Sequence, residues 1–148
     1  MTLLDAPKYD PTRDRRRIVR IIGSAIVILV LAGFAWFFRY WPEEHVVNKF
    51  FTALQKQDYE TAYGVWMHDP QWKEHQAQYA RYAYKDFYSD WGPGGEWGLV
   101  KSHEIYASGT PPGKSSSGVI VEVIVNGRSE HARVWVDKSD KTLGFSPY

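Results

Sequence analysis

The residues with the clearest potential for chemistry are Glu122 and His131, on either side of an Asn-Gly pair at residues 126–127. Asn-Gly between two β-branched runs is the strongest short signal for a two-residue hairpin turn, and such a turn places Glu122 opposite His131. Arg133 and Trp135 then follow on the same face of the sheet. A carboxylate beside an imidazole can transfer protons if both groups lie in a cleft.

The alternative is that Glu122 and His131 form a solvated ion pair on an exposed sheet face. We favour this alternative, because the opposite face of the same two strands is the better core. That face carries Val119, Val121, Val123, Ala132 and Val134.

Other catalytic or metal-binding patterns are weak. The chain has no cysteine, so disulfides and thiolate chemistry are excluded. Serines 115–117 have no base fixed beside them, and the GPGG at residues 92–95 lacks the lysine and the strand–loop–helix context of a phosphate loop. We therefore expect no metal ion and no cofactor, since the remaining histidines stand at no metal-binding spacing: His45, His68, His75 and His103.

Residues 21–38 form an uncharged apolar run in which Ser24 is the only polar side chain. With residues 18–20 this run is long enough to span a bilayer, which takes roughly 17–25 residues. A core helix of a soluble domain needs a polar face, and a cleaved signal has a shorter run that ends at small residues. Bulky aromatic residues end this run instead. We predict a permanent transmembrane helix over residues 18–41, preceded by a disordered cytoplasmic tail at residues 1–17.

Orientation follows from the charges that flank this helix. Six Lys or Arg residues precede the apolar run, and three follow it within a similar distance. Short cytoplasmic flanks carry the excess of positive charge, so residues 42–148 should be extracytoplasmic, at the cell (inner) membrane. The flanking residues expected to hold the helix in the lipid bilayer are Arg15, Arg16, Arg17 and Arg20, and the interfacial rings Trp36, Tyr40 and Trp41.

The part after the anchor is mildly acidic. Residues 42–148 contain eleven Lys or Arg and fourteen Asp or Glu, with no basic stripe. We therefore expect no nucleic-acid partner. Residues 109–118, GTPPGKSSSG, are typical of a flexible loop between strands.

The first half of this domain has helical periodicity. Pro42 with two following glutamates predicts a helix start, and Asp58 is a predicted cap for a second helix. A third helix is predicted from about Gln71 to Asp90, because aromatic residues recur there at helical spacing. Such an aromatic stripe is more often core than the lining of a ligand cavity.

Strand patterns follow. Residues 99–107, 119–125, 128–136 and 142–146 are the predicted strands, with a turn at residues 137–140 between the last two. Helices followed by an antiparallel meander indicate an α+β fold, with about three helices packed on about four strands.

The segment from His45 to Trp66, HVVNKFFTALQKQDYETAYGVW, resembles the opening of the NTF2-like (SnoaL-like) superfamily. Both have an amphipathic helix, a link in which Asp58-Tyr59 and Ala62-Tyr63 match the family pattern, and a second helix with an aromatic residue. The resemblance covers roughly residues 43–148. It implies a cone in which a curved sheet wraps helices, often around a pocket. The helix at residues 71–90 and the WGPGGEWG link depart from the enzymes of the family.

Two functions follow from this resemblance. The first is a binding or scaffold module, a subunit or accessory of a membrane-associated assembly, with a protein partner or a second copy. Anchored members of the superfamily in secretion machines and Mce-associated proteins are of this kind. The alternative is an enzyme of the isomerase, dehydratase or cyclase type, or a small-ligand binder, that uses the cone interior. The resemblance then makes Glu122, His131, Tyr82 and Asp86 the candidate catalytic residues. We favour the first.

Overall fold

The structure is a computed structural model that describes residues 11–111 and 117–147. It divides into two compact units, Met1–Arg39 and Tyr40–Tyr148, which are described separately below. Much of the predicted loop at residues 109–118 and most of the predicted tail lie outside the described residues.

The first unit contains a single described helix, α1 (Pro11–Phe37), of 27 residues. It is long and apolar enough to cross a membrane. The prediction of a disordered tail up to residue 17 was wrong for residues 11–17, which are helical. Proline is well suited to a first helical turn, and the arginines that follow are good helix formers. The helix ends at Phe37 rather than at residue 41.

The second unit begins with two helices. α2 (Trp41–Gln55) has Pro42 in its first turn and buries one face, as its periodicity predicts. α3 (Tyr59–Trp66) is capped by Asp58, whose Oδ1 accepts a hydrogen bond from the Thr61 N–H at 3.1 Å. This confirms the predicted cap. Hydrogen bonds from Thr61 hold the pKa of the Asp58 carboxyl below its ordinary value.

The predicted long helix over residues 71–90 was wrong. That segment contains turns, a short 3-10 helix, η2 (Gln76–Tyr79), and then α4 (Tyr84–Trp91). The Asp69 carboxylate organises the non-helical part by accepting hydrogen bonds from the Gln71 N–H, His75 Nδ1 and the Tyr79 hydroxyl. These local bonds compete with a helical backbone, and the aromatic residues that imitate a helical stripe pack from a folded loop instead.

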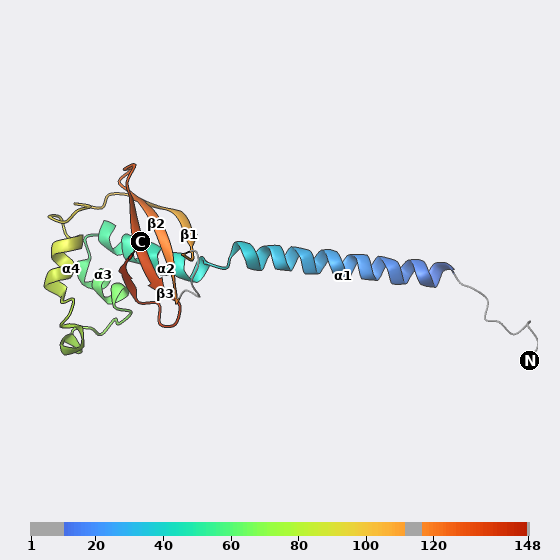
Figure 1. The fold of residues 1–148 in the computed structure, drawn as a ribbon, viewed down its shortest axis with the longest axis horizontal. Coiled ribbons are helices and arrows are strands. Elements are labelled where there is room, and N and C mark those ends of the chain that lie inside the picture. The colour runs from blue at the N-terminus through green and yellow to red at the C-terminus, as the bar shows by residue number, and fades with distance from the viewer. Residues whose placement is uncertain (1–10, 112–116, 148) are drawn as a thin grey trace, which may run out of the picture. The chain divides into compact units, whose positions relative to one another are not determined.

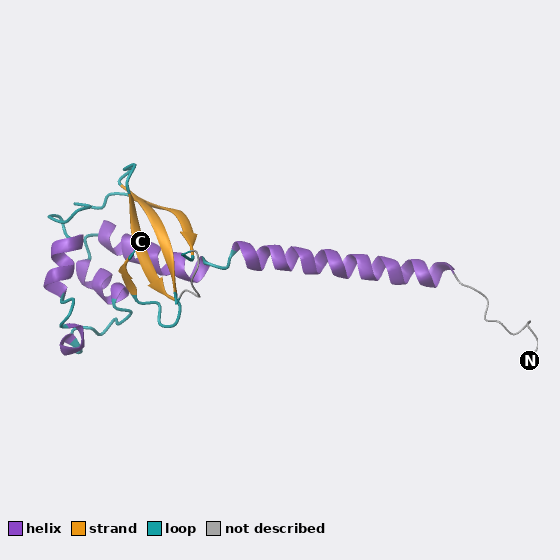
Figure 2. Cartoon of the chain, in the orientation of Figure 1, coloured by secondary structure: helices purple, strands orange, loops and turns teal. Residues whose placement is uncertain are grey.

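The four strands are β1 (His103–Gly109), β2 (Gly118–Val125), β3 (His131–Asp137) and β4 (Leu143–Phe145). They form one antiparallel sheet in the order β1-β2-β3-β4 (Figure 1; Figure 2). The register shifts between Ile105 and Ala107, where Tyr106 forms a bulge in β1. The fold is α+β.

The hairpin between β2 and β3 has the predicted turn but a different register. Asn126 and Gly127 both have positive φ, 54° and 65°, as a type I′ turn requires, and the Arg128 N–H bonds the Val125 carbonyl at 3.0 Å. Ser129 and Glu130 then add two residues before pairing resumes. Glu122 therefore opposes Arg133 rather than His131, so the predicted direct pairing was wrong. Because the shift is an even number of residues, each side chain keeps its predicted face.

The core lies between one sheet face and the helices. α2 crosses the sheet and contacts β1, β2 and β3, while α3 contacts β4 and α4. The predicted inner face is confirmed: its valines and Ala132 are at most 2% exposed. They face the buried side of α2, which contributes Val47, Phe50, Phe51 and Leu54.

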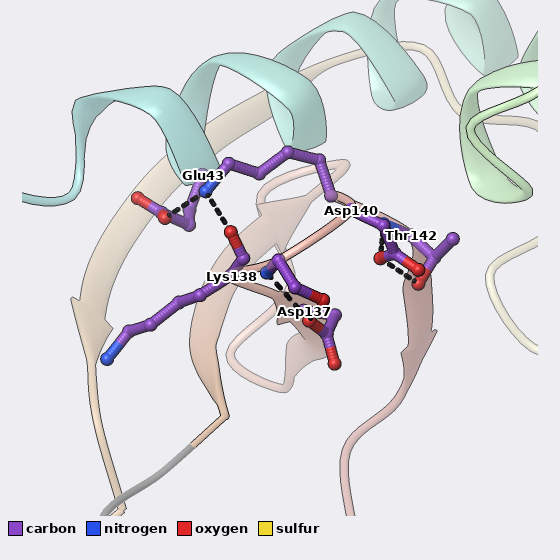
Figure 3. A network of polar contacts seen from close by, with 7 residues as sticks. Glu43, Asp137, Lys138, Asp140 and Thr142 are labelled. Atoms are coloured by element: carbon purple, nitrogen blue, oxygen red, sulfur yellow. Dashed lines mark hydrogen bonds and ion pairs between the residues drawn. The ribbon is translucent and has the colours of Figure 1, made fainter.

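One buried ion pair joins the start of α2 to the β3–β4 turn. Glu43 is 5% exposed, and its Oε1 accepts a hydrogen bond from Lys141 Nζ at 2.7 Å. Lys141 has a φ of 61° and also donates to the carbonyl of Lys138 at 3.0 Å. Figure 3 shows this contact above a turn whose own bonds run from Ser139 to Asp137 and from Thr142 to Asp140.

Candidate functional site

Glu122 is the centre of a polar cluster on the outer face of the sheet. Its Oε2 lies 3.4 Å from His131 Nδ1, and its Oε1 accepts a hydrogen bond from Arg133 Nε at 3.1 Å. The ring of Tyr106, presented by the bulge in β1, lies 4.4 Å from the His131 ring, centroid to centroid. The structure thus brings Glu122 and His131 together across two strands, although they are not directly opposite.

The surroundings of this cluster decide what it can do. The side chains of Glu122 and His131 are about one-quarter exposed, whereas those of Arg133 and Tyr106 are largely exposed. Arg133 occupies one carboxylate oxygen and His131 lies beside the other, so both oxygens have a partner. This arrangement is suited to holding charges in place at a contact surface, more than to poising an acid and a base in a water-free cleft.

The other two sequence candidates lie elsewhere. The Tyr82 hydroxyl donates to Asp90 Oδ2 at 2.9 Å, and burial together with this carboxylate raises the pKa of Tyr82. Asp86 accepts a hydrogen bond from the Ala83 N–H at 3.3 Å and so caps α4. Both belong to the helical side of the domain. The four candidates therefore do not form one site.

Aromatic rings fill the interior on the helical side of the sheet. Phe50 lies 5.2 Å from Trp66 and 5.0 Å from Trp91, between ring centroids. Phe145 at the end of β4 stacks on Trp91 at 6.1 Å with an interplanar angle of 11°. Of the aromatic residues between positions 71 and 91, Trp72, Phe87 and Trp91 are buried in the core, as expected, although Trp72 and Trp91 also border hollows at the surface.

A hollow on the surface of the helical side was missed by sequence reasoning. It has a volume of about 670 Å³ and runs between α2, α3 and the segment after α3. Val46, Val65 and Trp72 contribute apolar walls, and Glu60 and Lys73, which form an ion pair, also line it. No motif marks these residues, because the hollow arises from the folding of residues 67–74, which the helical prediction did not anticipate.

Two histidines make hydrogen bonds that sequence spacing could not reveal. His75 Nδ1 lies 2.7 Å from Asp69 Oδ2, and this contact, with further hydrogen bonds, lowers the pKa of the Asp69 carboxyl. His103 lies 2.9 Å from Asn48 Oδ1 and stacks on Phe51, and burial lowers its pKa. His75 has one carboxylate partner, and His103 has only neutral partners. Among residues 11–111 and 117–147, no three His, Asp or Glu side chains are grouped to hold a metal ion.

The residues predicted to flank the anchor divide between the two units. Arg15, Arg16, Arg17 and Arg20 lie in the first turns of α1, and the Arg39 guanidinium lies 3.9 Å from the centroid of the Trp36 ring. Tyr40 instead belongs to the second unit, where its hydroxyl lies 3.1 Å from Thr110 Oγ1. Trp41 begins α2, is 55% exposed and stacks on His45.

Comparison of the chain with family models, with curated proteins and with solved structures found no match. The function has to be argued from the geometry of the domain and the character of α1.

Proposed function

We propose that this protein is a single-pass protein of the cell (inner) membrane whose extracytoplasmic domain is a binding or scaffold module, a subunit or accessory of a membrane-associated assembly. The observation that carries the proposal is the contrast between the two faces of the sheet. One face is buried under aromatic core, while the other presents Glu122, His131, Arg133 and Tyr106 without a covering helix in the described residues.

The outer face has the composition of a protein contact surface. Ile120, Ile124 and Trp135 are partly exposed around the charged cluster. Apolar and aromatic side chains together with an arginine are typical of the centres of protein interfaces. A fixed pattern of charges favours a partner whose surface carries the complementary charges. The proposal includes an NTF2-like assignment, for which the order of helices and meander is the support. The enzyme alternative has less support, because rings fill the interior where a substrate would bind.

Crosslinking in the native membrane tests the contact surface. A photoreactive amino acid at Ile124 should form a specific adduct with a partner, and the same group at Lys85, exposed on α4, is the control. Reversing the central charge with Glu122→Arg should reduce the Ile124 adduct at least fivefold, because it places two guanidinium groups, the new one and that of Arg133, side by side. Equal adducts at both positions, or an adduct that is insensitive to Glu122→Arg, would refute the outer face as the docking surface.

The membrane part of the proposal has its own test. A reporter active only outside the cytoplasm, fused after Tyr148, should be active, because positive charge is concentrated at the N-terminal end of α1. Changing Arg15, Arg16 and Arg17 to Glu and adding lysines after Trp41 should invert part of the population. Activity of a cytoplasm-only reporter in the unchanged protein would reverse the proposed orientation.

A further inference from the structure

The surface hollow between α2, α3 and residues 67–74 has no part in the proposed function. Its volume of about 670 Å³ falls within the range of roughly 300–1,000 Å³ that is typical of small-molecule sites. Its described lining comes from the helices and the segment after α3, and includes no residue of the sheet. Val46, Val65 and Trp72 give it apolar walls, and the polar groups around these walls decide which molecule fits.

Trp72 forms a fixed wall of this hollow. It is 7% exposed, and its indole N–H donates a hydrogen bond to the Glu60 carbonyl at 3.1 Å. Its ring stacks on the ring of Tyr84, with 5.0 Å between the centroids and an interplanar angle of 20°. Because the only polar side-chain atom of Trp72 is already bonded, this wall suits an apolar group.

The end of the hollow beside Trp72 offers little to an anion. The Lys73 ammonium forms an ion pair with the carboxylate of Glu60, which lies in the first turn of α3. Glu74 also lines the hollow, and its carboxylate forms no ion pair within the described residues. The positive charge at this end is therefore already compensated, and one negative charge is left over.

The other end of the hollow gathers three side chains that can donate hydrogen bonds. His45 and Lys49 lie one turn apart on α2, and His68 lies just after α3. Residues 56–58 connect the two helices, which pack on each other, so the chain reverses and the start of α2 lies beside the end of α3. In the part of the chain that the structure describes, the side-chain nitrogens of these three residues form no hydrogen bond or ion pair.

The two ends of the hollow are separated by the length of α3. His68 follows Glu60 by eight positions, which corresponds to about 12 Å at roughly 1.5 Å per residue. A lysine ammonium brings a positive charge with its donors, and an imidazole in either protonation state donates at least one N–H. Donors at one end, apolar walls in the middle and a residual carboxylate at the far end match a molecule with an anionic head and an uncharged apolar tail.

We propose that this hollow binds a single-chain amphipathic carboxylate as a free ligand. The carboxylate of the ligand accepts hydrogen bonds from His45, Lys49 and His68. Its alkyl chain lies along Val65 and the ring of Trp72. The site uses neither α1 nor the outer face of the sheet, so it does not depend on the proposed function.

Photolabelling of the full-length protein in nanodiscs of phosphatidylcholine tests the class of ligand. The probe is decanoate with a diazirine on its chain, and mass spectrometry of the digested protein locates the adduct. Labelling of residues 60–74 should be saturable. The amide and the ammonium analogues of the same chain should label these residues at least about fivefold less, because neither has a negative head. Equal labelling by the three probes, or a preference for the ammonium, would overturn the proposal.

Two substitutions remove donors from the hollow without disturbing the fold. Lys49→Gln acts on an exposed side chain, and His68→Gly suits the positive φ of 52° at that position. Each should reduce the saturable labelling by about three- to tenfold, because a hydrogen bond to a charged group is lost at a site that is open to water. Lys85→Gln, on α4 and outside the hollow, is the matched control and should stay within about twofold. Unchanged labelling of the first two variants, or an equal loss in the control, would refute the assignment of the head.

Competition separates a carboxylate amphiphile from smaller and larger ligands. Acetate, which has the head without the chain, should displace the probe at least about tenfold more weakly than unlabelled decanoate. Equal displacement would show an adventitious ion only and overturn the proposal. Phosphatidylglycerol in the disc, compared at the same free concentration of probe, should not displace it. Complete displacement would assign the hollow to bilayer headgroups and overturn a free amphiphile as the ligand.

Discussion

The buried ion pair between Glu43 and Lys141 gives the sharpest prediction for stability. Glu43 is 5% exposed, and its Oε2 makes no hydrogen bond to any residue that the structure describes, so the charge depends on Lys141 for compensation. Removing one partner of a fully buried pair costs roughly 3–5 kcal/mol. The Lys141 side chain is 28% exposed, so water can partly replace it. We expect Lys141→Met, which keeps most of the aliphatic stem, to reduce the free energy of unfolding by about 2–3 kcal/mol.

The assay is urea unfolding of the full-length protein in detergent, followed by the fluorescence of its tryptophans. Lys85→Met, at an exposed position on α4, is the control and should change stability by less than about 0.5 kcal/mol. The double variant Glu43→Gln with Lys141→Met should recover at least half of the loss, since no unpaired charge remains buried. Equal stabilities of the Lys141 variant and the wild type would refute the claim that the pair is desolvated.

Three further changes test the turn, a close packing contact and a helix cap. Gly127→Val should reduce the free energy of unfolding by on the order of 1–2 kcal/mol, because the φ of Gly127 is positive. Glu122→Ala should reduce it by less, since it removes contacts worth about 0–1 kcal/mol. If thermal unfolding showed the reverse order, the Glu122 cluster would be buried. Gly118→Ala should cost about 1–3 kcal/mol, since a Cβ there lies 2.3 Å from the Trp135 ring; an unchanged melting temperature would contradict this contact. Asp58→Ala should cost about 1 kcal/mol near neutral pH. Because the pKa of the Asp58 carboxyl is lowered in the folded state, its ionised form stabilises the fold above about pH 4. The cost of Asp58→Ala should therefore shrink as the pH falls through the folded-state pKa. A cost that does not depend on pH would contradict the cap.

Patterns of period two predicted the sheet well. The alternation in residues 119–136 identified the buried face, and the Asn-Gly pair identified the turn, because both depend on residues close in sequence. The register was wrong because Ser129 and Glu130 extend the loop without a distinctive signal. The prediction still placed Glu122 and His131 on one face, since a shift in register by two residues leaves each side chain on the same face of the sheet.

The failures came from contacts between distant or irregular segments. The aromatic spacing over residues 71–90 imitated a helix, and the bonds of Asp69 that prevent one were not visible as a pattern. The pair of Glu43 and Lys141 joins residues 98 positions apart.

The position of α2 has a mechanical consequence. The first helix after α1 is also the central helix of the core. Near its start it is held by the ion pair of Glu43 with Lys141 and by the hydrogen bond that the Ser108 hydroxyl donates to Glu44 at 2.6 Å. A pull that reaches the domain through α1 therefore loads α2 before any other element. To unfold the domain, this force has to break both attachments and the packing of α2 on three strands at the same time. It does not first detach a peripheral segment. A load applied at α1 would thus be borne by the core of the domain.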